Sequence, residues 1–176
     1  VFYSLFQYFS IRDYSYIYFG FYSASLLLLL AIFKGYTIEY FLGEIPNFNI
    51  YIKLLVCTSG IISILFTTEF LKTIVNTPRR HIWLLSFIIF YIASAVLLLY
   101  GGERLANSLI YYNTVSTVAF IIYVSLSRTK KGFRPAFYYF LAWSILLSGI
   151  VLTVLREHEL IAYNLFTEHI LQISIL

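Results

Sequence analysis

Residues 136–155 form an uncharged, apolar stretch that directly follows a basic turn containing Lys130, Lys131 and Arg134. An α-helix rises about 1.5 Å per residue and the hydrocarbon core of a bilayer is about 30 Å thick, so this stretch is long enough to cross a membrane. Pro135 suits the first turn of a helix, where its missing N–H would be unpaired anyway. The segment therefore predicts a transmembrane helix with its basic start on the cytoplasmic side.

The composition extends this interpretation to the whole chain. Of its 176 residues, 61% are hydrophobic and 11% are charged, which leaves no polar face for each helix to show to water. We therefore predict an all-α, polytopic membrane helix bundle with membrane lipids as its surroundings. The net charge of +4 does not indicate nucleic acid, because the basic residues lie in short loops and form no continuous face.

Seven transmembrane helices are expected, of which the first and last are truncated. The apolar stretches that predict them are 1–11, 14–33, 50–71, 82–100, 105–126, 136–155 and 164–176. The first and last are too short to span a bilayer. We therefore expect a single transmembrane domain over residues 1–176 that is a fragment of a longer protein.

The basic residues predict the orientation of these helices. Eight of the 12 Lys and Arg residues fall in the loops after the first, third and fifth stretches, namely Arg12, Lys72, Arg79, Arg80, Arg128, Lys130, Lys131 and Arg134. Short loops rich in Lys and Arg stay in the cytoplasm. The N-terminus is therefore predicted outside and the C-terminus in the cytoplasm.

The residues that carry chemistry do not form a recognisable constellation. His81, His158 and His169 lie in different segments and form no pair with metal-ligand spacing, although His158 and His169 could meet with Glu159 at the outer rim. Serine and threonine residues lack a histidine and a carboxylate at the same depth. Cys57 is the only cysteine, which excludes a disulfide within the chain. We expect no catalytic residues, no metal site and no cofactor.

Two acidic residues on predicted helices are candidates for packing or signalling. Glu69 lies near the cytoplasmic end of the third stretch, where an ion pair with Lys72 three residues on is the simplest role. Glu168 and Gln172 are four residues apart and share one face of the seventh helix. The simpler hypothesis is that they form a hydrogen-bonded clamp near the outer interface. The more specific hypothesis is that this clamp has two arrangements and couples the outer face to the seventh helix.

Several motifs resemble one bacterial receptor family. KGFRPAFYYFLAW begins at Lys131 and includes Arg134 and Pro135, and FTTEFLKT spans the end of the third stretch at Glu69. YSYIYFGFYS follows the Arg12-Asp13 turn, and TEHILQIS opens the seventh helix. In this order they resemble the seven-helix module called 7TM-DISM, the diverse intracellular signalling module. Ser174 departs from the pattern, because the family usually has glycine there.

The resemblance implies a membrane transducer in the bacterial inner membrane. In that family the helices join an N-terminal extracytoplasmic sensor to a C-terminal cytoplasmic output domain of the same chain, such as a histidine kinase or a diguanylate cyclase. We expect this function for the present chain, and the sequence leaves open whether it forms a homodimer.

Two other classes of protein are compatible with a polytopic helix bundle. One is a small-molecule transporter or channel subunit, and the other is a membrane-embedded enzyme acting on lipid. Transport requires ionisable or unwound segments near the membrane midplane, and the second, fourth, fifth and sixth stretches carry none there. The sequence therefore favours the transducer.

Overall fold

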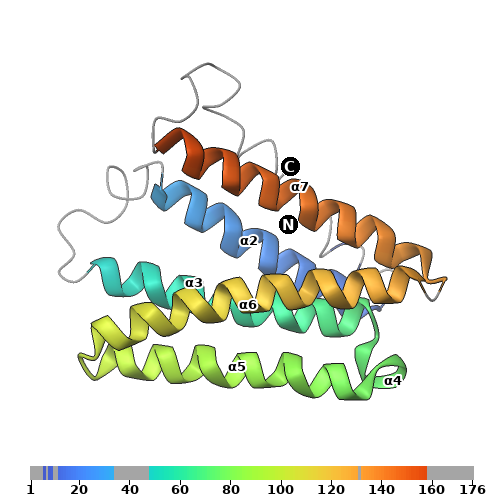
Figure 1. The fold of residues 1–176 in the computed structure, drawn as a ribbon, viewed down its shortest axis with the longest axis horizontal. Coiled ribbons are helices and arrows are strands. Elements are labelled where there is room, and N and C mark those ends of the chain that lie inside the picture. Colours follow the sequence, from blue (N-terminus) through green and yellow to red (C-terminus); the bar gives the residue numbers. More distant parts are fainter. Residues whose placement is uncertain (1–5, 7, 10–11, 34–47, 131, 158–176) are drawn as a thin grey trace. The chain divides into compact units, whose positions relative to one another are not determined.

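The computed structural model describes residues 6, 8–9, 12–33, 48–130 and 132–157, and within these ranges the chain is helical and contains no strand (Figure 1). The principal helices are α2 (Tyr14–Phe33), α3 (Phe48–Phe70), α4 (Thr73–Asn76), α5 (Pro78–Leu99), α6 (Glu103–Lys130) and α7 (Arg134–Glu157). The predicted all-α class is confirmed for this part of the chain. The first and seventh predicted helices fall largely or wholly outside the described residues.

Four of the described helices are long and apolar enough to cross a membrane: α2, α3, α5 and α6. Their bounds agree closely with the predicted stretches, and α2 coincides with residues 14–33. The α7 helix has 24 residues and, at about 1.5 Å per residue, is also long enough to span the hydrocarbon core. Large apolar side chains remain exposed along α5, among them Ile82, Trp83 and Ile89, as expected for a surface that contacts lipid.

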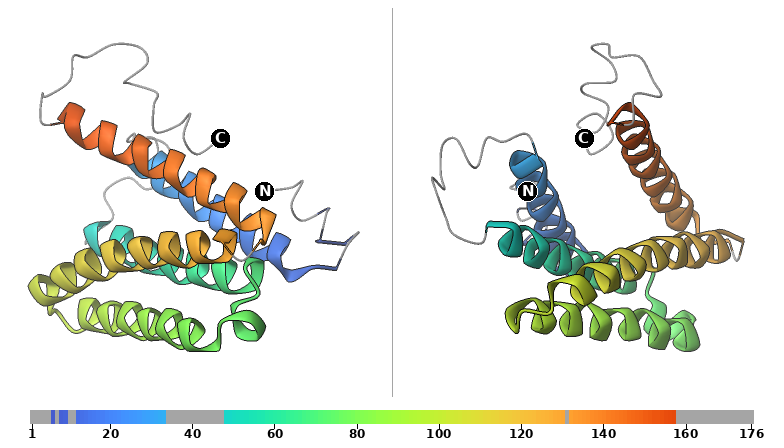
Figure 2. Two further views of the ribbon diagram at one scale, coloured as in Figure 1. Left: turned by 45° about the vertical axis from the view of Figure 1, so that its right-hand side comes forward. Right: turned by 60° about the vertical axis from the view of Figure 1, so that its left-hand side comes forward.

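The chain divides into two compact units, residues 1–121 and 122–176, so α6 begins in the first and ends in the second. Within the first unit, α3 packs against α2 and also against α5, while the short α4 contacts α3 and α5 (Figure 2). Hydrogen bonds join α5 to the first half of α6. The core of this unit is therefore built around α3.

Two predicted basic loops are shorter in the structure than in the prediction. Residues 72–81 were expected to be a loop, but α4 occupies part of that segment and α5 already starts at Pro78, the favoured position for proline in a helix. Residues 127–134 were also expected to be a loop, but α6 continues to Lys130. The extension of α6 has an electrostatic cause, because Arg128 and Lys130 lie in its last turn, where positive charges interact favourably with the helix dipole. The last predicted polar loop is shortened too, since α7 reaches Glu157.

A glycine with positive φ follows the end of α5 and another follows the end of α6. At the end of α5, Gly101 has φ 83° and Gly102 N–H donates to the Leu97 carbonyl at 2.9 Å. At the end of α6, Gly132 has φ 85° and Phe133 N–H donates to the Arg128 carbonyl at 3.3 Å. Both are Schellman turns, in which a left-handed residue lets the chain reverse direction. The Arg128 guanidinium also lies 5.1 Å from the centre of the Phe133 ring.

Candidate functional site

Hydroxyl side chains line α3 and are satisfied mostly within their own helix. Ser63 donates to the Gly60 carbonyl at 2.8 Å, and Thr67 donates to the Ser63 carbonyl at 2.7 Å. Ser59 and Thr68 make similar bonds one turn back along the helix. These bonds remove the cost of burying a hydroxyl away from water. They also leave small side chains on α3, which allow neighbouring helices to approach closely.

A close approach occurs at Gly60, where α5 places Tyr91 against the α3 backbone. A Cβ atom added at Gly60 would lie 2.5 Å from Cζ of Tyr91, which is closer than real Cβ contacts. Tyr91 is 1% exposed, so its ring is fully packed. Its phenol donates a hydrogen bond to the Thr114 Oγ1 of α6 at 3.1 Å. Tyr91 therefore connects three helices, α3 by packing and α6 by a hydrogen bond.

A second hydrogen bond joins α5 and α6 beside this contact. The Asn113 side-chain amide donates to the Phe87 carbonyl at 3.2 Å, and the Phe87 ring lies 5.7 Å from that of Phe120. Thr117, one turn beyond Asn113, is 2% exposed, and its hydroxyl has no hydrogen-bond partner among the described residues. We refer to Gly60, Tyr91, Asn113, Thr114 and Thr117 as the Tyr91 cluster. Together with Phe87, it supplies two hydrogen bonds between α5 and α6 in the described part of the first unit.

One end of the first unit carries positive charge and an anionic helix cap. Asp13 precedes α2, and its carboxylate accepts a hydrogen bond from the Ser15 N–H at 2.9 Å. That backbone bond lowers the pKa of Asp13; partial burial opposes the effect, and the Ser15 side chain and the Lys72 charge add to it. Lys72 follows α3 in a left-handed conformation with φ 46°. The segments after the first and third predicted helices therefore lie at the same end.

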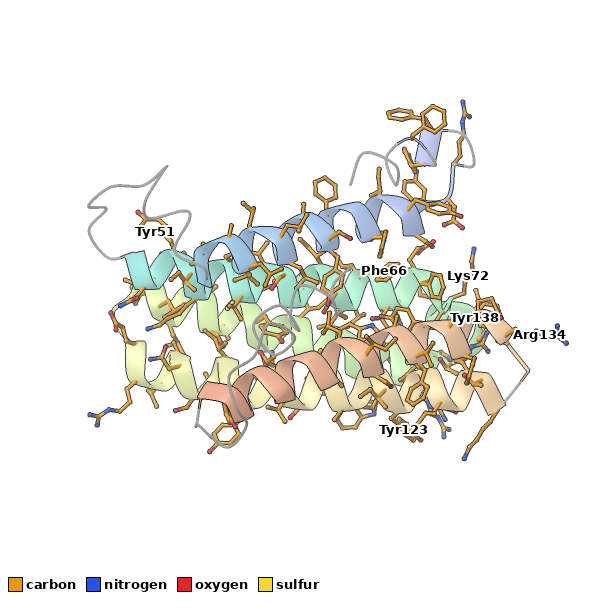
Figure 3. All side chains as sticks on the ribbon, turned by 90° about the horizontal axis from the view of Figure 1, so that it is seen from above. Tyr51, Phe66, Lys72, Tyr123, Arg134 and Tyr138 are labelled. Atoms are coloured by element: carbon orange, nitrogen blue, oxygen red, sulfur yellow. The ribbon has the colours of Figure 1, made fainter. Side chains whose placement is uncertain are left out.

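The opposite end of α3 carries an ion pair and a groove. Lys53 Nζ of α3 lies 3.8 Å from Glu103 Oε2 at the start of α6. Figure 3 labels Tyr51 and Lys72 near opposite ends of α3. A groove of about 340 Å³ runs between α3 and α6 beside this pair, and we call it the Lys53 groove. The residues that line it are Lys53, Val56, Asn107, Ile110, Tyr111, Thr114 and Val115.

The residues singled out from the sequence lie in different parts of the chain, and some of them lie outside the described residues. Glu69 is half-buried in the last turn of α3. Within the described ranges its carboxylate makes no ion pair with Lys72, and that expectation is wrong. The reason is that Lys72 adopts left-handed backbone angles, so the helical i,i+3 geometry ends before it.

Pro135 lies in the first turn of α7, as predicted, whereas Arg134, which was expected in the preceding loop, is the first residue of that helix. Both residues are exposed. Figure 3 shows the Arg134 side chain extending away from that helix. Glu168 and Gln172 lie outside the described residues, as do His158, Glu159 and His169. Among the residues that are described, no three His, Cys, Asp or Glu side chains are grouped to hold a metal ion.

Sequence reasoning missed the Tyr91 cluster and the Lys53 groove. A signal for the cluster was present: Asn113 is an amide inside an apolar stretch, and polar side chains at such positions turn toward other helices. Tyr91 could not be distinguished from the other tyrosines in the sequence, because the chain contains 17 of them and many lie near helix ends. The partners of both sites depend on how the helices are rotated about their axes, which a single sequence does not specify.

Four apolar helices of membrane-spanning length define the class of protein, a multi-pass membrane protein. The comparison with protein families then names it more closely. The family described as 7TM diverse intracellular signalling matches residues 1–176, and the chain belongs to that family of membrane signalling receptor domains. The resemblance seen in the sequence motifs is thereby confirmed. No curated protein and no solved structure matches the chain.

Proposed function

We propose that this chain is the membrane transducer domain of a bacterial signalling receptor, located in the inner membrane. It relays a signal from an extracytoplasmic sensor to a cytoplasmic output domain, both parts of the same longer chain. The observation that carries the proposal is the family match over residues 1–176. The full arrangement has seven helices, with the N-terminus outside and the C-terminus in the cytoplasm, and the module catalyses no reaction of its own.

Charge at the two ends of the first unit supports this orientation. The end at Lys72 also carries Arg12, Arg79 and Arg80, since α5 begins directly after α4. The other end carries Lys53 paired with Glu103, together with Arg104. Cations concentrate on the cytoplasmic side of multi-pass proteins, so the Lys72 end is assigned to the cytoplasm.

The packing of the first unit suits a relay better than a transport path. The described spans α2 and α5 carry no ionisable group between their first and last turns other than tyrosine, whereas transporters place ions and substrates near the midplane. The polar side chains at mid-depth are instead used to hold helices together, as in the Tyr91 cluster. A displacement of α6 at the outer end would therefore be transmitted to α5 and α3 through side chains that fit in one arrangement.

Cysteine labelling tests the orientation. In a Cys57→Ser background, a cysteine replacing Glu103 should react with a membrane-impermeant maleimide from outside intact cells. A cysteine replacing Arg79 should react only after permeabilisation, and so should one replacing Lys131. Equal expression of the three variants is the control. Labelling of the Arg79 position from outside, with protection of the Glu103 position, would reverse the proposed topology.

A further inference from the structure

The Lys53 groove combines an apolar interior with a cation at one end. Val56, Ile110 and Val115 supply its aliphatic walls, and Lys53 and Asn107 lie toward the end at which α3 and α6 begin. Thr114 is seven residues beyond Asn107, which corresponds to about 10 Å along α6. A volume of about 340 Å³ is at the small end of the range for sites that bind small molecules. The groove is thus shaped for a narrow molecule that is polar at one end.

The positive charge of Lys53 favours a negatively charged ligand in the groove. Lys53 lines the groove, and Glu103 does not. Their separation of 3.8 Å is longer than the roughly 2.8 Å of a charge-assisted hydrogen bond, so Glu103 holds the ammonium only loosely. The Glu103 carboxylate is also 57% exposed, against 26% for the Lys53 side chain. A ligand carboxylate could therefore take the Lys53 donors while Glu103 turns to water.

The far end of the groove leads to the Tyr91 cluster. Thr114 lines the groove and accepts the hydrogen bond of the Tyr91 phenol at 3.1 Å. A molecule that packs against Thr114 therefore contacts a residue that holds α5 and α6 together. Binding in this groove would act on the contact that the proposed relay uses.

We propose that the Lys53 groove binds a small amphiphilic carboxylate, of the class of medium-chain fatty acids. The carboxylate pairs with Lys53, and the chain lies against Ile110 and Val115 toward Thr114. The occupant is a single-chain molecule, because a phospholipid with two acyl chains exceeds the volume of the groove. It arrives from the outer side, because the Lys53 end is the outer end in the proposed orientation. This inference rests on the proposed function, since it names the class of ligand to which the transducer responds.

The test measures binding of radiolabelled decanoate to the full-length protein in nanodiscs, with empty nanodiscs as the blank. Binding should be saturable, and Lys53→Gln should weaken it about tenfold, the effect of losing one hydrogen bond to a charged group. Lys53→Arg should retain binding, because the positive charge is kept. Glu103→Gln should strengthen it about twofold or more, because the competing carboxylate is removed.

Matched controls separate the groove from general effects. Lys72→Gln removes a cation from the other end of α3 and should leave decanoate binding unchanged. Decanol has the same chain without the charge, and its affinity should not respond to Lys53→Gln. Val115→Trp fills the groove and should abolish binding of both molecules. Unchanged thermal stability of each variant shows that the fold is intact.

Three outcomes would overturn the proposal. One is uptake of decanoate that does not saturate and is equal in all variants. The second is binding unaffected by both Lys53→Gln and Val115→Trp. The third is competitive displacement of decanoate by an anionic phospholipid, which would assign the groove to lipid. None of these three outcomes would contradict the proposed relay function, because the topology and the response of the output domain are measured independently of decanoate.

Discussion

The two faces of α3 are packed in different ways. Toward α2, the contacts are between aromatic rings: Phe66 lies 5.5 Å from Phe19 and 6.4 Å from Tyr22, measured between ring centres. Phe66 also contacts Phe70 on its own helix at 5.5 Å, and Figure 3 labels it along α3. Toward α5, the contact is between the Gly60 backbone and the Tyr91 ring, with no room for a Cβ atom. One face is filled by large side chains, and the other is fitted around a glycine.

This difference indicates which interface tolerates change. Ring contacts such as those of Phe66 depend on shape and area and have broad geometric optima. The Tyr91 contact is fixed at both ends, by the backbone of α3 and by the hydroxyl of Thr114. A small change there has few ways to relax, because helices in a membrane are held by close packing rather than by a hydrophobic force. The α3–α5 interface should therefore be the more sensitive one.

The largest expected effect is that of Gly60→Ala. The added Cβ meets Cζ of Tyr91 at 2.5 Å and its Cε2 and Oη at 2.8 Å, so the ring must move. Overpacking of this kind costs about 1–3 kcal/mol. The free energy of unfolding in mixed micelles is the measurement, and Ala93→Val on the exposed side of α5 is the matched control. In a Tyr91→Leu background the cost of Gly60→Ala should largely disappear. An equal cost in both backgrounds would show that the clash is not with Tyr91.

Tyr91→Phe should have a smaller effect, because it removes the hydroxyl and keeps the ring. Hydrogen bonds between membrane helices contribute about 0.6 kcal/mol on average and about 1.7 kcal/mol at most. We expect a loss of stability in that range, together with a change in the basal activity of the proposed output domain in the full-length protein. Tyr112→Phe is the control, since its ring is 69% exposed on α6. A loss of stability with unchanged output would leave Tyr91 a structural role only.

Much of the helical architecture could be predicted from the sequence, because local features determine it. Runs of uncharged apolar residues gave the positions of α2, α3, α5, α6 and α7, and Pro135 gave the start of α7. Helix ends near cations were predicted too short, since Lys130 and Pro78 are compatible with either a helix or a loop. The site was not predicted, because Gly60, Tyr91 and Thr114 lie on three helices and meet only through tertiary packing.

The smallest expected effect is that of Asp13→Asn, which tests whether charge contributes to the stability of the α2–α3 contact. Asp13 caps α2 by accepting the Ser15 N–H, and the Lys72 charge after α3 further lowers its pKa. Because the folded-state pKa lies below its usual value near 3.8, the carboxylate stabilises the fold above that value. The contribution fades as the pH falls below about 4 through the folded-state pKa.

Asp13→Asn retains a good cap but removes the charge, so it should cost at most about 0.5 kcal/mol at neutral pH and low salt. This cost should shrink in high salt and vanish in acid, whereas the cost of Gly60→Ala should depend on neither. A cost of Asp13→Asn that is independent of pH and salt would mean that Asp13 acts through its hydrogen bond alone, and that α2 and α3 are held together by packing without help from charge.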